Sequence, residues 1–176
     1  MSVGSCSVRN VDGIKPGADG RDDFDFIFGW WRITNRRLVD PTDQGCTDWI
    51  EFETASHAYP IFGGLAHLDL IEAGADAPGG PWEGLTLRQF NPATGLWSIW
   101  WASSRQLGHV DPPLTGKFVD GVGHFEGDDV IGGRALKLRF EWRNPSEDSA
   151  RWQQEFSFDG GDTWFVNWIM EFARRK

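Results

Sequence analysis

The sequence predicts an all-β domain, a closed up-and-down antiparallel barrel of about ten strands preceded by a short helical turn. Three observations support this fold class. Segments of alternating apolar and polar residues follow one another, with turn residues roughly every 8 to 12 positions. No long stretch has the three- and four-residue apolar spacing of an amphipathic helix. No internal repeat is evident, which disfavours a propeller, and a meander of this length must close or leave two unpaired edges.

The chain begins with a predicted flexible tail over residues 1–22, which contain few large apolar side chains to offset the entropy of ordering. Residues 23–176 are expected to form one domain. The first apolar residues of that domain have helical spacing: Phe24, Ile27, Phe28 and Trp31. A short helical turn is therefore expected here, and Asp22 can cap it.

Alternation and turn residues then define ten candidate strands: 31–39, 48–55, 64–72, 83–91, 96–103, 114–119, 122–128, 134–143, 150–158 and 163–173. Clear turn sequences separate several of them, including NPATG at 91–95, DG at 120–121 and GG at 132–133. All nine prolines are expected in connections or in the tail, which would leave the hydrogen-bond ladders intact.

The stretch SFDGGDTW at 157–164 resembles an Asp-box, a hairpin motif of sialidase propellers. Its Asp accepts backbone hydrogen bonds across a tight turn, its glycines supply positive φ, and its Trp packs under the hairpin. Each of these roles is structural. One copy therefore predicts a fixed hairpin between the last two strands, without glycosidase activity or a calcium site.

Composition excludes several classes of partner. The formal net charge of −9 argues against nucleic acid and against an anionic membrane surface. The first ten residues lack the apolar core of a secretory signal, no run is long enough to span a membrane, and a cytoplasmic protein is expected. Cys6 lies in the tail and Cys46 in a loop-like stretch, so no structural disulfide is expected.

Gly29, Trp30 and Trp31 form a G-x-W motif at the entry to the first strand, and the last strand ends in Arg174 and Arg175. This pairing resembles the lipocalin and calycin signature. The resemblance implies that the Trp closes one end of the barrel and that a late Arg packs over its indole by a cation–π contact.

Several longer stretches within residues 23–174 resemble an uncharacterised bacterial family of lipocalin-like proteins: FDFIFGWWRITNRRL, GLTLRQFNPATGLWSIWWAS, GKFVDGVGHFEGDD and RWQQEFSFDGGDTWFVNWIMEF. The resemblance implies a fold but no activity. The chain departs from the family in its 22-residue tail and in the additional Trp30.

Strand alternation predicts which side chains face the barrel interior. The last three strands would contribute an apolar wall: Trp164, Val166, Trp168, Met170 and Phe172; Trp152, Gln154, Phe156 and Phe158; Leu136, Leu138, Phe140 and Trp142. The first half would add more polar faces: Trp31, Ile33, Asn35 and Arg37; Leu65, His67, Asp69 and Ile71; Thr86, Arg88 and Phe90; Trp97, Ile99, Trp101 and Ser103. An aromatic wall with a few polar groups is typical of a small-molecule site.

The candidate ligand-binding residues are Arg37, His67, Arg88, Phe90, Trp101, Gln154 and Trp168. The aromatic members would stack on a ligand and the polar members would orient it. An interior Arg88 would need a partner, either Asp69 or an anionic ligand. Two alternatives stay open: the arginines could pair with outward carboxylates, and the 11 Trp and 13 Phe could simply fill the barrel.

The favoured function is binding of a small hydrophobic or aromatic molecule in the barrel. One alternative is an enzyme of the cyclase or isomerase type that uses His67 and Asp69 as an acid–base pair. Another is a filled barrel that assembles as a homodimer through external aromatic residues. No cofactor or metal is expected, because the histidines lack ligand spacing and because His124, Glu126 and Asp128 should point to solvent.

Overall fold

A computed structural model describes residues 19–143 and 145–175. Ten strands are present: β1 (Gly29–Leu38), β2 (Trp49–Ile61), β3 (Ala66–Ala73), β4 (Trp82–Asn91), β5 (Leu96–Ser103), β6 (Leu114–Val119), β7 (Val122–Ile131), β8 (Arg134–Arg143), β9 (Ser149–Ser157) and β10 (Phe165–Arg174). Two single-turn 3-10 helices accompany them, η1 (Asp25–Ile27) and η2 (Phe62–Gly64). No helix in this described part is long and apolar enough to cross a membrane. The predicted tail lies outside the described residues up to residue 18, as does Cys6.

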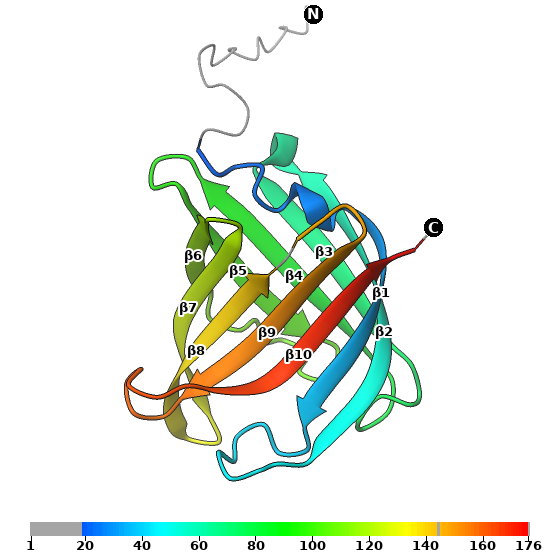
Figure 1. The fold of residues 1–176 in the computed structure, drawn as a ribbon, viewed down its shortest axis with the longest axis vertical. Helices are drawn as coiled ribbons and strands as arrows, with labels where there is room; N and C mark the ends of the chain where they lie inside the picture. The colour runs from blue at the N-terminus through cyan, green and yellow to red at the C-terminus, as the bar shows by residue number, and fades with distance from the viewer. Residues whose placement is uncertain (1–18, 144, 176) are drawn as a thin grey trace, which may run out of the picture.

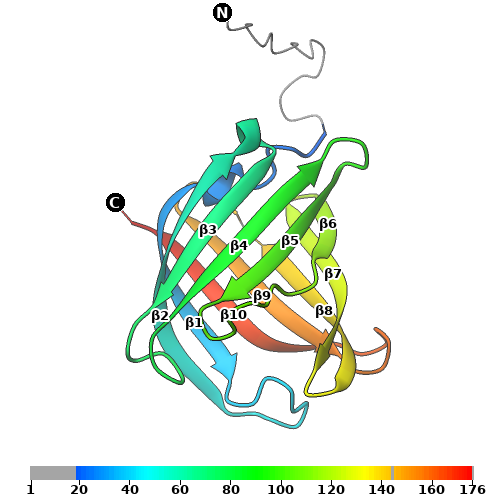
Figure 2. The same ribbon diagram turned by 180° about the vertical axis from the view of Figure 1, so that it is seen from behind.

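The strands form one closed antiparallel barrel (Figure 1), in which each strand pairs with its neighbours in sequence and β1 also pairs with β10. The closing ladder runs from Trp31 opposite Arg174 to Arg37 opposite Trp168. The predicted closed up-and-down barrel is therefore confirmed. Because consecutive strands run in opposite directions, the connections gather alternately at the two ends of the barrel (Figures 1 and 2).

Helix η1 lies across one end of the barrel, where Phe24 and Ile27 are fully buried. The indole N–H of Trp31 donates to the carbonyl of Ile27 at 2.6 Å. The Arg174 guanidinium lies 4.1 Å from the Trp31 ring centroid and donates to the carbonyls of Phe28 and Phe26 at 2.5 and 2.8 Å. The expected Trp–Arg contact is thus present, and it fastens η1 over this end.

The start of η1 differs from the expected capping. Phe24 occupies the N-cap position, and no side chain caps the helix. Asp22 contributes only its main-chain carbonyl, which accepts from the N–H of Asp25 at 3.0 Å. Just before it, the carbonyl of Gly20 accepts from the indole N–H of Trp97 at 2.9 Å, so the chain lies against the barrel from residue 20 onward.

Strand β2 is longer than predicted, because it continues beyond residue 55 to Ile61 and includes Pro60. The expectation that every proline lies in a connection or the tail is therefore wrong. The ladder between β1 and β2 ends where Gly29 pairs with Ala58, so beyond this point β2 pairs only with β3. A strand with one free edge tolerates a residue that lacks an N–H.

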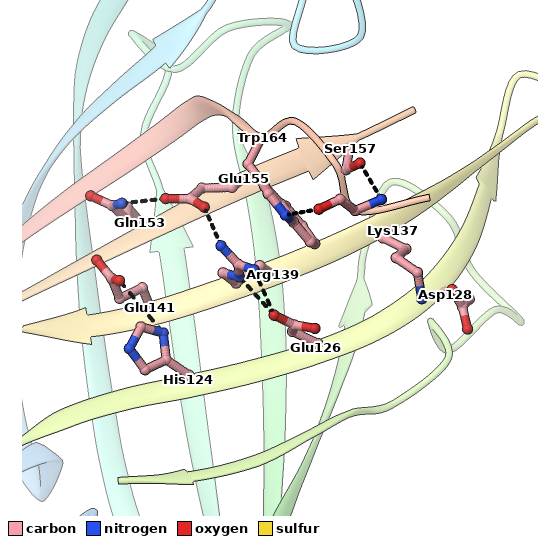
Figure 3. Close-up of polar contacts among 11 residues, drawn as sticks. His124, Glu126, Asp128, Lys137, Arg139, Glu141, Gln153, Glu155, Ser157 and Trp164 are labelled. Atoms are coloured by element: carbon pink, nitrogen blue, oxygen red, sulfur yellow. Dashed lines mark hydrogen bonds and ion pairs between the residues drawn. The ribbon is translucent and has the colours of Figure 1, made fainter. Parts of the chain in front are cut away.

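The hairpin between β9 and β10 has the predicted fixed geometry. Asp159 accepts from the hydroxyl of Ser157 at 2.7 Å and from the N–H of Thr163 at 2.9 Å. A hydrogen bond from the Thr163 hydroxyl, with the bonds from the Thr163 N–H and the Ser157 hydroxyl, holds the pKa of Asp159 well below its ordinary value. Figure 3 shows the indole of Trp164 donating to the same turn, at the Gly161 carbonyl 2.9 Å away. The motif is a structural turn.

Candidate functional site

The barrel encloses a cavity of about 280 Å³, which extends to the loops that follow β1 and β5, at the end opposite η1. The loops at this end contribute Pro41 and Thr42, between β1 and β2, and Asp111 and Pro112, between β5 and β6. The aromatic part of its wall consists of Trp101, Phe140, Trp142, Trp152, Phe156, Trp168 and Phe172. The other half of the barrel is filled by a core around Phe24, Trp31, Trp97 and Phe125. The barrel is thus closed and solid at one end and hollow toward the other.

Arg88 on β4 lines the cavity and is 3% exposed. Its Nη2 donates to Oδ2 of Asp69 on β3 at 3.0 Å, and Asp69 is 1% exposed. The Arg88 guanidinium also lies 5.1 Å from the ring centroid of Phe24 and 5.6 Å from that of Trp142. Of the two partners expected for an interior Arg88, Asp69 or an anionic ligand, the structure shows the ion pair with Asp69. Nε and Nη1 of Arg88 and Oδ1 of Asp69 are buried without a hydrogen-bond partner among the described residues.

Arg37 and Trp168 lie side by side where β1 pairs with β10, and both line the cavity. The indole N–H of Trp168 donates to Oδ1 of Asn35 at 3.0 Å, and Asn35 is held in turn by Thr54 Oγ1 at 3.0 Å. This chain of bonds fixes the plane of the indole. The Arg37 guanidinium lies 5.7 Å from the Trp168 ring centroid, and its buried Nε has no partner in the described part of the chain.

The surroundings of Arg37 disfavour the charged form of its guanidinium. Burial lowers the pKa of Arg37, and the positive charge of Arg105 lowers it further. Arg105 is held by the carbonyls of Pro78 and Gly80, each accepting at 2.6 Å. Carbonyls orient the guanidinium but do not neutralise it. Arg105 itself stacks on the ring of Trp82, 5.7 Å from its centroid.

A β-bulge between Val166 and Trp168 changes which side chains of β10 face inward. Trp164 and Val166, predicted to be interior, lie outside instead: Val166 pairs with Glu155, and the Trp164 ring stacks with the outward Arg139. Beyond the bulge, Trp168, Met170 and Phe172 line the cavity as predicted. The bulge also buries Asn167, which accepts from Gln154 Nε2 at 3.0 Å and donates to the Pro41 carbonyl at 3.1 Å.

Two of the seven candidate binding residues do not line the cavity. Phe90 and His67 belong to the filled half, where His67 is fully buried and contacts the rings of Phe28 and Trp97. Burial lowers the pKa of His67 to about 4, and the charge of Arg88 contributes to this shift. Neither ring nitrogen has a hydrogen-bond partner among the described residues, and Asp69 bonds to Arg88 instead. The proposed acid–base pair is therefore not assembled in this structure.

The remaining five candidates do line the cavity: Arg37, Arg88, Trp101, Gln154 and Trp168. Sequence reasoning missed two carboxylates that also line it, Asp111 and Asp129. Burial raises the pKa of Asp111, and the charge of Asp129 adds to this effect. Asp111 lies in the β5–β6 connection, outside any alternating pattern, so alternation could not place it.

The outer face of β7, β8 and β9 carries a network of charged side chains (Figure 3). Glu126 pairs with Arg139 at 2.8 Å, Asp128 with Lys137 at 3.1 Å, and His124 with Glu141 at 3.5 Å. Phe125, which lies between His124 and Glu126 in the sequence, is fully buried. Alternation along the strand therefore directs His124, Glu126 and Asp128 outward, as predicted. In residues 19–143 and 145–175, no cluster of three or more His, Cys, Asp or Glu side chains is arranged to hold a metal ion.

Comparison with models of known protein families and with curated proteins gives no match for this chain. The fold and the cavity are therefore the observations from which a function can be argued.

Proposed function

We propose that this protein binds a small hydrophobic or aromatic molecule in the barrel cavity, as a member of the lipocalin-like, calycin-type barrels. The observation that carries the proposal is the cavity itself, which places aromatic rings beside guanidinium groups in one half of an otherwise filled barrel. A closed barrel of ten antiparallel strands and the contact between Trp31 and Arg174 support the family assignment.

The size of the cavity limits the ligand. About 280 Å³ corresponds to the liquid volume of about nine water molecules, so a single ring system fits better than a long lipid chain. The rings of Trp101 and Trp168 offer stacking area, and Gln154 and Arg88 offer polar contacts. The indole of Trp168 is oriented by Asn35 before any ligand arrives, which reduces the entropy lost on binding.

Native mass spectrometry of the full-length protein, with and without added indole, tests this proposal. We expect a one-to-one adduct. Thr86→Phe places a ring inside the cavity and should abolish the adduct, whereas Leu87→Phe on the outer face of the same strand should retain it. Absence of any adduct, or equal binding by both variants, would count against a site inside the barrel.

A second candidate function, self-association, is favoured by an apolar area outside the barrel. Pairing of β1 to β5 brings eight outward side chains together, which we call the apolar sheet face: Trp30, His57, Tyr59, Leu68, Leu70, Leu85, Leu87 and Trp100. Trp30 is 54% exposed and Leu70 is 45% exposed. None of these eight side chains is acidic, although the exposed Glu72 and Glu83 border the face on β3 and β4. An exposed apolar area of this kind is typical of an interface between copies of a chain.

Analytical ultracentrifugation tests the second candidate. We expect a dimer that Leu70→Asp converts to a monomer. Val119→Asp is a matched control, because Val119 is also apolar and exposed but lies on β6, away from the apolar sheet face. A monomeric wild-type protein at micromolar concentration would exclude a homodimer.

A further inference from the structure

The charges around the cavity indicate which chemical class of ligand it accepts. The Arg37 guanidinium lies 5.7 Å from the ring centroid of Trp168, and the Arg105 guanidinium lies 5.7 Å from that of Trp82, which belongs to the same apolar cluster as Trp168. Among the described residues, neither guanidinium has a carboxylate within ion-pair distance, although Asp and Glu outnumber Lys and Arg by 26 to 17 in this chain. A partly buried cation without a counter-ion is unfavourable and is stabilised by an anion.

The remaining polar groups of the cavity leave Arg37 as the position for that anion. Arg88 is already neutralised by Asp69. Asp111 and Asp129 come from the β5–β6 loop and β7, which lie across the barrel from β1 in the order of strands. These carboxylates repel an anion and so favour its placement on the β1 side. The ring of Trp168, held by Asn35, lies directly beside Arg37.

We propose that the ligand is a small aromatic carboxylate, whose carboxylate group accepts hydrogen bonds from the guanidinium of Arg37 and whose ring packs on Trp168 and Trp101. This inference rests on the proposed function and narrows it. Guanidinium and carboxylate form charge-assisted hydrogen bonds that are stronger than neutral ones. Arg105 adds long-range attraction without touching the ligand, and the apolar wall excludes water from the ring.

Phenylacetate and phenylacetamide test this inference as a matched pair of probes. They have nearly the same shape, about ten non-hydrogen atoms and a size suited to the cavity, but only phenylacetate is charged. Each is titrated into the full-length protein while the indole N–H signal of Trp168 is followed by two-dimensional NMR. We expect phenylacetate to bind at least about tenfold more tightly than phenylacetamide, the gain given by one charge-assisted hydrogen bond.

Substitutions assign the preference to a residue. Arg37→Met should remove the preference for phenylacetate and leave the affinity for phenylacetamide unchanged, and Arg37→Lys should retain part of it. Arg36→Met is the control, because it removes the same charge from the adjacent residue, which points outward and pairs with Glu51 at 3.2 Å. It should keep the full preference.

The outcomes separate the inference from the proposed function. Equal affinity for the two probes, or a preference that survives Arg37→Met, would overturn the carboxylate inference while leaving a cavity that binds neutral rings. Failure of both probes to shift the Trp168 signal at millimolar concentration would overturn the inference and the proposed cavity function together.

Discussion

At the scale of single residues, the interior of this barrel contains buried polar side chains as well as apolar ones. Asn35, Asp69 and Arg88 are all less than 4% exposed, and each bonds to a side chain on a neighbouring strand. Burial of such groups is favourable only when partners are present. The polar side of the cavity is therefore maintained by pairs of residues, and the loss of one member affects the other.

Arg88→Met should lower the free energy of unfolding by about 3–5 kcal/mol, because it leaves Asp69 buried without its partner. Adding Asp69→Leu should restore most of this loss, since an apolar pair of similar volume has no charge to desolvate. Arg36→Met, which breaks an exposed ion pair, should cost no more than about 1 kcal/mol. Urea unfolding of the wild type, the two single variants Arg88→Met and Asp69→Leu, the double variant and Arg36→Met measures these differences, and an additive double variant would contradict the coupling.

His67 should make stability depend on pH. Its pKa is about 4 when folded and about 6.5 when unfolded, so the unfolded chain binds a proton that the folded chain does not. Stability from neutral His67 is complete above about pH 6.5 and is lost as pH falls toward 4, by on the order of 3 kcal/mol.

The measurement is urea unfolding at a series of pH values between 7 and 4.5. His67→Leu should flatten the dependence in this window, and His57→Gln, at the outer face beside Trp30, is the matched histidine substitution outside the core. An unaltered slope in His67→Leu would show that other groups cause the pH dependence.

The sequence predicted which polar residues face the barrel interior, but it did not predict at which level along the barrel they lie. Alternation placed Arg37, Arg88 and Asp69 inside, and the cost of burying a charge indicated Asp69 or an anionic ligand as the partner of Arg88. Alternation did not show that η1 fills one end of the barrel. His67 and Phe90 were therefore expected in the cavity, although they lie in the core. Alternation gives the direction of a side chain but not its height along the barrel.

At the scale of secondary-structure elements, turn residues and alternation located all ten strands, but irregular elements escaped them. The β10 bulge is such a case: one additional residue turned Trp164 and Val166 outward and Asn167 inward. A bulge reverses the faces of a strand without any marker in its alternation. The paired strand β9, which is regular, has Trp152, Gln154 and Phe156 facing the cavity as expected.

Strand β4 shows how one glycine shapes the cavity wall. A Cβ atom on Gly84 would lie 2.0 Å from Cη2 of Trp101, so the indole can lie over β4 only because this position has no side chain. Gly84→Ala should therefore displace the Trp101 ring and lower stability by about 1–3 kcal/mol.

Urea unfolding measures the stability change, and phenylacetamide binding reports the altered cavity wall. Gly45→Ala in the β1–β2 loop is the control; its Cβ would meet only the Asp43 carboxylate, at 3.3 Å, and the change should stay within about 0.5 kcal/mol. Unchanged stability and binding in Gly84→Ala would show that the Trp101 ring can adopt another position without loss of free energy.

At the scale of the whole molecule, the two ends of the barrel differ in side-chain packing, and the strand pairs differ in the number of paired residues. One end is packed around η1, and the other holds the cavity. The ladder between β1 and β2 contains ten residue pairs, whereas the ladder between β5 and β6 contains three, from Trp97 opposite Gly116 to Ile99 opposite Leu114. Beyond Ile99, β5 has no paired residue on β6, and the connection that follows β5 contributes Asp111 to the cavity.

Hydrogen exchange should reveal this uneven closure. Local opening requires the least free energy where the fewest backbone hydrogen bonds and buried contacts are broken, so the β5–β6 seam should open first. We expect peptides covering residues 114–119 to exchange faster than peptides covering residues 29–38, as measured by hydrogen–deuterium exchange mass spectrometry. Ile99 and Leu114 also line the cavity, so a bound phenylacetate should slow exchange at the seam and leave β1 unaffected. Equal protection of the two segments would show that the barrel opens as a single cooperative unit despite its short ladder.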